Sequence, residues 1–309
     1  MRCCIVKNIF WAIQAAVFYC LTLFVALLPA SLTYRIGAMS GLLIPYIVPK
    51  RRAVIIDNID RALPFMKSHP PWVSTCEDSH ELARETFKNL GRSLMEVCRL
   101  YHGQGKNIIA NIEFRGRENY EAARAKDNGL IFLTGHCGNW ELLALTLSSY
   151  FGEEISCVAR RQNNPFLNRM VERMRQRYNS RVIYKQGALK NILKLLKRGE
   201  MVGILDDQAV IPEEGVLIDV MGRKAWASKA LVIITQKSSA PLIPVFIHRE
   251  GERHVITFYP EHHFSGDMSD EGIKIETQAL SRYVENFVVA NPTQWYWVHR
   301  RWKRAGAAI

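Results

Sequence analysis

This 309-residue sequence lacks the short paired spacings of cysteine and histidine that build tetrahedral metal sites, and acidic residues are its scarcer charged class. Its seven cysteines are scattered without a C-x-x-C pair, so neither a disulfide framework nor a tetrahedral zinc site is expected, and a reducing compartment is the simplest interpretation. Lys and Arg number 41 against 29 Asp and Glu, which gives a net charge of +12. This excess predicts an anionic partner, and composition alone leaves open nucleic acid, lipid headgroups or an acidic carrier.

The chain also lacks internal repeats, low-complexity tracts and any long Gly/Ser linker. Apolar residues make up 48% and charged residues 23%, close to the globular average. These values exclude global disorder and a polytopic membrane protein. The length suits one large α/β domain or two small ones.

One long uncharged run is present near the N-terminus, where 27 residues separate Lys7 from Arg35. About 20 apolar residues are enough to cross a bilayer, whereas the apolar part of a cleavable signal is about 7–15 residues long. We therefore expect a membrane helix. Two basic residues precede the run and four follow it closely, which favours a cytoplasmic position for the remainder of the chain.

A second apolar stretch covers residues 36–49, but it is too short to span a membrane and contains Pro45. It is expected to lie in the membrane interface or to cover the membrane-facing side of the body. The predicted division is an anchor and interfacial segment in residues 1–52 and a catalytic domain in residues 53–309.

Beyond residue 53, short apolar runs alternate with longer amphipathic stretches, as in strands separated by helices. Two of the runs, 130–134 and 242–247, are continuously apolar, which is typical of strands covered on both faces. The pattern predicts an α/β fold with a mostly parallel central sheet flanked by helices. The expected strands are 130–134, 155–160, 181–184, 201–205, 242–247 and 254–259, and the expected helices are 79–102, 139–150, 165–178, 189–198, 225–238 and 272–290.

The clearest chemical signal is an H-x4-E motif formed by His136 and Glu141, between an expected strand and an expected helix. Residues five apart on a helix lie about 140° from one another, so the histidine must precede the helix. From the first helical turn, Glu141 is expected to reach one imidazole nitrogen and to make the other a general base. Cys137 is not expected to be a nucleophile, because neighbouring side chains diverge.

A histidine that only caps or packs at a strand end is the alternative for an isolated H-x4-E, and the strand–turn–helix context favours the general base. No serine accompanies the pair, so the nucleophile is predicted to be a substrate hydroxyl that attacks an activated acyl carbonyl. Backbone amides after Gly138, at the start of the helix, are a candidate oxyanion site.

At these residues a family resemblance becomes visible. The motif resembles the H-x4-D/E signature of the glycerolipid acyltransferases, and nearly the whole chain is similar to the late acyltransferases of lipid A biosynthesis. Further matching segments are residues 158–165, 206–208, 240–245 and 291–303. The resemblance implies a glycerolipid acyltransferase-like fold and a cofactor-free, metal-free enzyme of the cell inner membrane, with its catalytic domain on the cytoplasmic side. His136 and Glu141 take the catalytic positions.

The resemblance also implies the partners. Acyl carrier protein or acyl-CoA would supply the acyl group, a glycolipid hydroxyl would accept it, inner membrane lipids would surround the protein, and nucleic acid would not be bound. The segment Asp206-Asp207-Gln208 departs from the Asp-Gln-Asp common in lipid A enzymes. A lysophospholipid or ornithine-lipid acceptor therefore remains an alternative, as do a thioester hydrolase and a non-catalytic protein that binds anionic lipid or nucleic acid.

Candidate substrate-binding residues follow the expected strands. Arg160 and Arg161 end one strand at the predicted edge of His136, where they could neutralise a phosphate. Arg173 belongs to a basic stripe on the next helix, for which a solvated charged face is equally plausible. Asn164 is a further candidate through its place in the matching segment 158–165.

Asp206 and Asp207 follow the apolar run 201–205 and are also candidates for substrate binding, or for orienting a basic residue or the attacking hydroxyl. A structural salt bridge is the alternative. Near the C-terminus, aromatic residues interleave with basic ones in the segment 295–304, which suits a lipid headgroup interface or ordinary packing of the rings.

Overall fold

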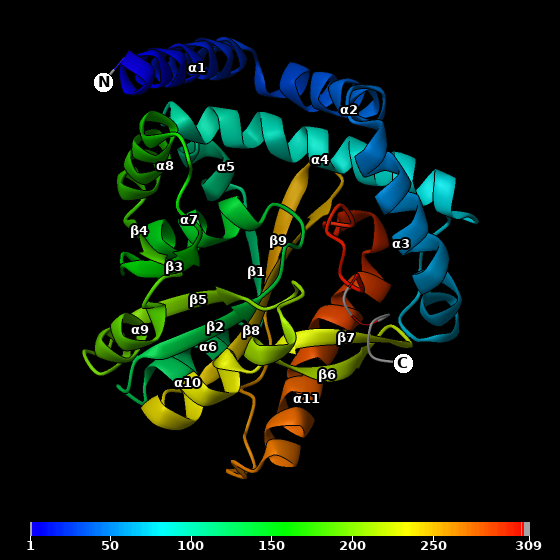
Figure 1. The fold of residues 1–309 in the computed structure, drawn as a ribbon, viewed down its shortest axis with the longest axis vertical. Helices are drawn as coiled ribbons and strands as arrows, with labels where there is room; N and C mark the ends of the chain where they lie inside the picture. Colours follow the sequence, from blue (N-terminus) through cyan, green and yellow to red (C-terminus); the bar gives the residue numbers. More distant parts are fainter. Residues whose placement is uncertain (1, 304, 306–309) are drawn as a thin grey trace.

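The computed structural model describes residues 2–303 and residue 305, and it places a central sheet between two layers of helices (Figure 1). The helices are α1 (Arg2–Leu27), α2 (Ala30–Ile47), α3 (Pro49–Ser68), α4 (Ser79–Tyr101), α5 (Lys106–Ala110), α6 (Arg117–Arg124), α7 (Trp140–Phe151), α8 (Pro165–Arg177), α9 (Ala188–Leu196), α10 (Ala230–Ser238) and α11 (Asp270–Ala290). The strands are β1 (Glu113–Arg115), β2 (Leu130–Thr134), β3 (Ile155–Ala159), β4 (Ser180–Tyr184), β5 (Met201–Leu205), β6 (Gly215–Val220), β7 (Arg223–Ser228), β8 (Leu242–Glu250) and β9 (Arg253–Phe258).

The central sheet has the strand order β1-β9-β8-β2-β5-β3-β4, and its neighbours are parallel except for the antiparallel pair β8–β9. The expected α/β fold with a mostly parallel sheet is confirmed. Strand β2 is wholly buried, since Leu130 and Phe132 pack toward α6 and α7 while Ile131 and Leu133 pack toward the layer of α9, α10 and α11. Each such buried side chain stabilises the fold by about 1.5–3 kcal/mol relative to an exposed one.

The expected helix 225–238 is wrong at its N-terminal end, because residues 225–228 are not helical. They belong to β7, which pairs with β6 in a separate two-stranded hairpin, and α10 starts only at Ala230. Alternate residues of β7, Ala225 and Ala227, are buried, which is the period of a strand. The expected helix merged a half-buried strand with the buried helix that follows it.

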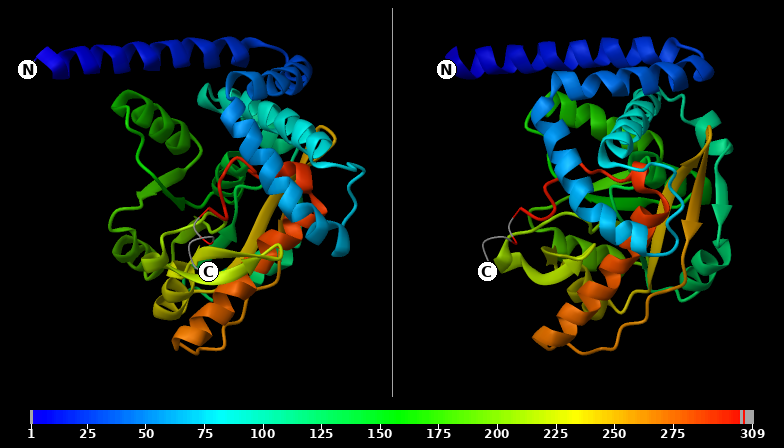
Figure 2. Two further views of the ribbon diagram at one scale, coloured as in Figure 1. Left: turned by 45° about the vertical axis from the view of Figure 1, so that its right-hand side comes forward. Right: turned by 90° about the vertical axis from the view of Figure 1, so that its right-hand side faces the viewer.

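Helix α1 contains the candidate membrane span, Val6–Leu27, with a mean hydropathy of 2.0. This assignment rests on length and composition alone. Only 17% of the most apolar window is buried, because one side of the helix contacts α4 and α8 while the outer side is free. Figure 2 shows α1 lying across one end of the molecule and extending past the body.

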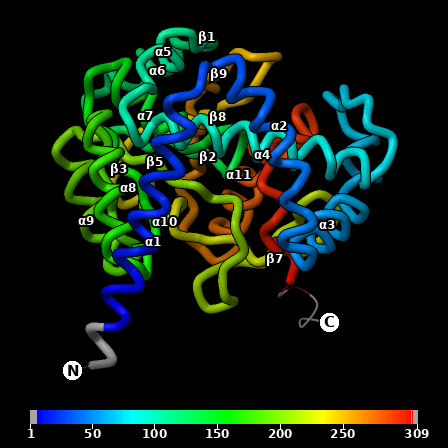
Figure 3. The backbone as a smooth tube through the Cα atoms, turned by 90° about the horizontal axis from the view of Figure 1, so that it is seen from above, coloured from blue at the N-terminus to red at the C-terminus, as the bar shows by residue number. Residues whose placement is uncertain are grey.

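Helix α2 packs on α4, and Pro45 lies inside its last turn. The helices approach closely through glycines, since a Cβ atom on Gly91 would overlap the backbone of Gly37 and one on Gly41 would overlap the backbone of Phe87. Seen from above, α1 and α2 pass over the sheet domain as one continuous layer (Figure 3). Glycine contacts therefore hold α2 close against α4.

The expected boundary between residues 52 and 53 falls inside α3. This helix is also tied to the C-terminal segment, because the amide nitrogen of Asn58 donates to the carbonyl oxygens of Trp297 at 2.7 Å and His299 at 2.8 Å. The N-terminal helices are thus joined to the body without an intervening linker.

Replacing Gly91 with Ala should lower the thermal unfolding midpoint of the detergent-solubilised protein. Alanine is favoured over glycine inside a helix by about 1 kcal/mol, so any loss must come from the overlap with Gly37, and overpacking typically costs about 1–3 kcal/mol. Gly203→Ala is the control, because its Cβ would make only ordinary contact with Cys157. A Gly91→Ala protein as stable as wild type would contradict the close packing of α2 on α4.

Candidate active site

The turn between β2 and α7 carries His136 and has a demanding backbone. Gly138 has φ +54°, and a Cβ there would overlap the carbonyl oxygen of Ile247 in β8. Asn139 then caps α7, because its side-chain oxygen accepts from the N–H of Leu142 at 3.2 Å. Glycine and asparagine therefore hold the histidine at the carboxyl end of β2, ahead of the helix.

Asp207 holds the imidazole of His136. One of its carboxylate oxygens lies 2.7 Å from Nδ1 of His136, and the other accepts from the backbone N–H of the same residue at 2.8 Å. The indole N–H of Trp295 donates to that second oxygen, also at 2.8 Å. Because an ionised carboxylate only accepts, Nδ1 carries the proton, and Nε2 of the neutral ring is left as a base.

Burial and mutual attraction together set the charge states of His136 and Asp207. Burial disfavours the imidazolium form of His136, but the charge and hydrogen bond of Asp207 outweigh that effect and raise its pKa above the usual value. Burial alone would raise the pKa of Asp207, whereas His136 and Trp295 lower it, so the carboxylate stays ionised. The site can thus hold a proton on His136 beside a fixed negative charge.

The expectation that Glu141 fixes the tautomer of His136 is corrected by this geometry. Both carboxylate oxygens of Glu141 instead accept from Arg175 of α8, each at 2.9 Å. The reason lies in the sheet: Thr134 of β2 pairs with Leu205 of β5, so the residues two positions beyond these strand ends face each other. Glu141 still acts on His136 through its charge, which raises the pKa of the imidazole.

The Nε2 side of His136 faces polar and aromatic neighbours. The side-chain amide of Gln208 donates toward Nε2 at 3.2 Å. The rings of Trp140 and Tyr296 lie 5.2 Å and 5.9 Å from the imidazole, centre to centre. Since 21% of the His136 side chain is exposed, the base can be reached from outside the fold.

The C-terminal segment 294–296 holds the same turn from the other side. Gln294 accepts from the N–H of Gly138 at 2.6 Å, and the N–H of Tyr296 donates to the carbonyl oxygen of His136 at 3.0 Å. The amide of Gly138 is therefore engaged, and the candidate oxyanion site, the amides that follow Gly138 at the start of α7, stays a prediction. Trp295, Trp297 and Trp302 are buried, so the headgroup-interface interpretation is wrong for these rings and the packing alternative is confirmed.

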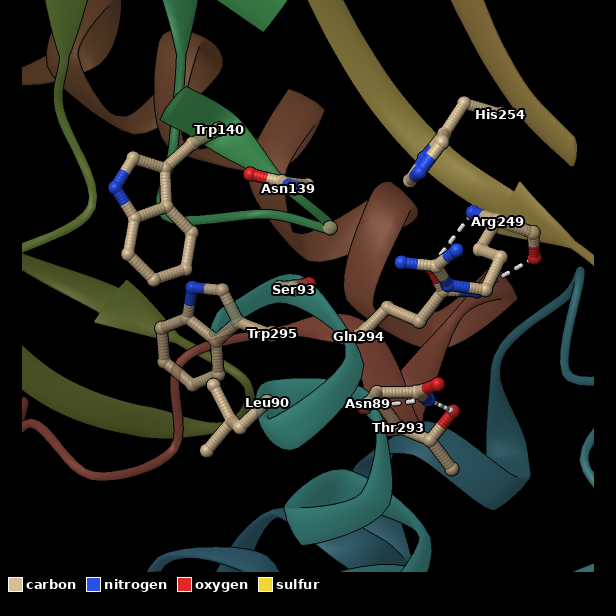
Figure 4. Close-up of a pocket in the computed structure, with 11 residues that line it drawn as sticks. Asn89, Leu90, Ser93, Asn139, Trp140, Arg249, His254, Thr293, Gln294 and Trp295 are labelled. Carbon is tan, nitrogen blue, oxygen red and sulfur yellow. Dashed lines mark hydrogen bonds between the residues drawn. The ribbon is translucent and has the colours of Figure 1, made fainter. Parts of the chain in front are cut away.

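A second charged network, centred on Glu96, lies behind the turn and was missed by sequence reasoning. Figure 4 shows three of its members, Asn139, Arg249 and His254, around a small pocket. Glu96 of α4 accepts from both terminal guanidinium nitrogens of Arg249, at 2.7 Å and 2.8 Å, from the side-chain amide of Asn139 at 2.8 Å, and from Nε2 of His254 at 3.0 Å. Burial opposes the charge on Glu96, but His254 and Arg249 lower its pKa overall. The adjoining cavity of about 10 Å³ holds roughly one water molecule.

The structure brings most of the other candidates to the same sheet edge. Arg160 and Arg161 follow β3, which neighbours β5, and both are exposed there. The guanidinium of Arg161 lies 5.5 Å from the centre of the Tyr184 ring. Arg173 is exposed on α8. These three side chains are available to a ligand.

Two candidates are engaged within the fold. Asn164 caps α8 by accepting from the N–H of Phe166 at 2.9 Å, and it donates to the carbonyl oxygen of Trp11 in α1 at 2.9 Å, so its substrate-binding assignment is corrected to a structural one. Asp207 likewise has both oxygens in use by His136 and Trp295, and it orients a basic residue rather than contacting substrate.

Asp206 and Cys137 complete the turn region. Burial, opposed by the charge of Arg301, raises the pKa of Asp206 to about 7. Cys137 is 1% exposed, and burial raises the pKa of its thiol well above the usual value, so it is no nucleophile.

Measurements of unfolding stability can test the hydrogen bond from Trp295 to Asp207. Trp295→Phe keeps most of the ring and removes a hydrogen bond to a buried charge, so the free energy of unfolding should fall by about 1.5–3 kcal/mol. Trp302→Phe is the matched control, because the indole N–H of Trp302 donates to the uncharged carbonyl oxygen of Val220. Losing this bond should lower the free energy of unfolding by about 0.5–1.5 kcal/mol. Equal losses in denaturant titrations would contradict an ionised Asp207 at this site.

Similarity to known proteins extends over most of the chain. A family model described as bacterial lipid A biosynthesis acyltransferase matches residues 7–304. A lipid A biosynthesis acyltransferase of Haemophilus influenzae is 22% identical over 94% of this chain and 87% of its own length. A lipid A biosynthesis lauroyltransferase of Escherichia coli is 24% identical over 89% and 87%. Among solved structures, the 1-acyl-sn-glycerophosphate acyltransferase PlsC of Thermotoga maritima matches with a TM-score of 0.38 and 15% identity, over 81% of this chain and 96% of that one.

Proposed function

Because the chain belongs to the bacterial lipid A biosynthesis acyltransferase family and is an acyl-transferring enzyme, we propose that it moves a fatty acyl chain from a thioester to a hydroxyl of a lipid A precursor. The observation that carries the proposal is the imidazole of His136. Asp207 holds its Nδ1 at 2.7 Å, and its Nε2 lies at the exposed sheet edge.

In this mechanism the acceptor hydroxyl replaces the side-chain amide of Gln208 beside Nε2 of His136. Nε2 takes the hydroxyl proton as the oxygen attacks the thioester carbonyl, and an ester bond forms as the carbon–sulfur bond breaks. The proton then passes from His136 to the departing thiolate. Asp207 stabilises the imidazolium between the two transfers, so no acyl-enzyme is needed.

Glu141 remains a proposed member of the catalytic site in a different role. Its charge supports the protonated form of His136, and its pair with Arg175 fixes the start of α7 against α8. Arg160, Arg161 and Arg173 are proposed to bind phosphate groups of the acceptor or donor, because they are exposed arginines on the elements that follow β3. Asp206 is proposed to contact the acceptor at the same edge.

The donor and the location belong to the same proposal. Acyl carrier protein or acyl-CoA would deliver the thioester, and the net charge of +12 supports an anionic donor. Helix α1 would hold the enzyme in the cell inner membrane with the catalytic site on the cytoplasmic side, since the exposed face of α1 is apolar. Bound in this way, the enzyme would meet a lipid acceptor and a water-soluble donor together.

An assay with a labelled acyl thioester identifies the acceptor lipid. Incubated with the detergent-solubilised enzyme, it should transfer label to a lipid A precursor and leave lysophospholipid and ornithine lipid unlabelled, with mass spectrometry as the readout. The carrier-protein and CoA thioesters are compared in parallel. Label only in free fatty acid would indicate a hydrolase, and label in another lipid would reject the proposed acceptor.

A further inference from the structure

A second cavity lies away from His136, between the start of α2, the middle of α4 and the turn joining β8 to β9. Its volume is about 280 Å³, far above the roughly 10–15 Å³ that a single water molecule requires. Arg92, Glu96 and Arg99 line it from one face of α4, Tyr34 lines it from α2, and His254 lines it from β9. Neighbouring elements thus direct basic and polar side chains into one space.

Four buried polar atoms of these walls have no hydrogen-bond partner among the residues that the structure describes. They are Nε of Arg92, Nε of Arg99, Oε1 of Gln104 and Nδ1 of His254. His254 is only 3% exposed. Buried polar atoms in folded proteins are nearly always paired, so four side chains with unpaired atoms around one cavity indicate a polar site.

The charges of the walls favour an anion. Arg92, Arg99 and Arg253 contribute three positive charges, whereas Glu96 is already paired with Arg249. The other acidic residue of the lining, Glu252, is exposed to solvent, as is Arg253, so the less exposed walls keep the two positive charges of Arg92 and Arg99. Arginine offers the forked donors that suit phosphate oxygens.

Exposed apolar side chains lie on α1 and α2 next to this polar cavity, which favours a lipid over a free ion. Ala30 and Ser31 at the start of α2 line the cavity, and a terminal guanidinium nitrogen of Arg99 donates to the carbonyl oxygen of Leu28, in the junction of α1 and α2, at 2.6 Å. Large apolar side chains flank the junction on the outer surface: Phe24 is 64% exposed, Leu27 73% and Leu32 42%. An anionic group bound here would continue into an apolar surface, as the headgroup of a membrane lipid does.

We propose that this cavity binds the phosphate of an anionic membrane phospholipid whose acyl chains lie along α1. The site is separate from the proposed acyl-transfer reaction and does not depend on it. Glu96 lines the cavity and also accepts from Asn139, the cap of α7. A bound lipid therefore contacts the residues that hold the turn of His136 in place.

Native mass spectrometry of the full chain in detergent tests the proposal by titration with phosphatidylglycerol and phosphatidylcholine. Wild type should bind one phosphatidylglycerol more tightly than phosphatidylcholine. The pair Arg92→Gln and Arg99→Gln should weaken phosphatidylglycerol about thirtyfold, from the loss of two basic contacts to an anionic lipid. Lys190→Gln with Lys194→Gln removes the same charge from the exposed face of α9 and should leave binding unchanged.

Arg253→Gln is the second variant, because this exposed residue of the β8–β9 turn can change without disturbing the helices. It should weaken phosphatidylglycerol severalfold in a protein with an unchanged unfolding midpoint. Unaltered binding in both cavity variants would overturn the proposal. Displacement of phosphatidylglycerol by an equal concentration of inorganic phosphate would assign the cavity to free phosphate and reject a phospholipid as its ligand.

Discussion

Replacing His136 with Asn should lower the turnover of acyl transfer by about 10²–10⁴-fold, the contribution typical of a positioned general base. The asparagine amide can take the place of Nδ1 and keep a donor toward Asp207, but it offers no equivalent of Nε2. The loss should therefore appear in kcat with little change in KM for either substrate. Single-turnover assays with a labelled acyl thioester and a lipid acceptor measure it directly.

The control for this variant is His263→Asn, since the side chain of His263 is 80% exposed. Its turnover should match wild type. Both proteins should unfold at the temperature of wild type, which shows that the loss at His136 is chemical. If the His136→Asn enzyme keeps more than a third of wild-type turnover, His136 is not the base.

Asp207→Asn should be nearly as damaging, with a loss of about 10²–10⁴-fold. In Ser-His-Asp enzymes an aspartate that fixes the catalytic imidazole contributes about 10⁴, because its amide analogue stabilises the wrong tautomer. Asp207 makes the equivalent bond here, at 2.7 Å from Nδ1. Glu141→Gln is the matched control: its carboxylate bonds Arg175, so only its charge acts on His136, and a clearly smaller loss than that of Asp207→Asn is expected.

The pH dependence of kcat/KM also distinguishes Asp207 from Glu141 as the partner of His136. The base works only when His136 is neutral, and its pKa is raised, so the acid limb of kcat/KM in wild type should lie above pH 6.5. Without the charge of Asp207, burial remains as the dominant influence and lowers the pKa of His136. The acid limb of Asp207→Asn should therefore move to lower pH. A limb that stays in place in Asp207→Asn but shifts in Glu141→Gln would restore Glu141 as the partner of His136.

The fold could be predicted from the sequence where burial leaves a clear period. Strands such as β2 and β5 are continuous apolar runs, and the sequence placed both at their observed bounds. The hairpin of β6 and β7 was missed because its alternation is short and adjoins the apolar helix α10. Glu96, Arg249 and His254 were missed for another reason: they are up to 158 positions apart, and no local pattern joins them.

The sequence by itself determined that His136 and two aspartates follow buried strands, and the ends of parallel strands meet at one edge of a sheet. Which carboxylate holds the imidazole was decided by the tertiary structure alone. Glu141 is close to His136 along the chain, but α7 directs it to Arg175, whereas the pairing of Thr134 with Leu205 sets Asp207 opposite the histidine. A hydrogen bond depends on the direction of two side chains over about 3 Å, and that direction is set by neighbouring strands and by Trp295, not by spacing in the sequence.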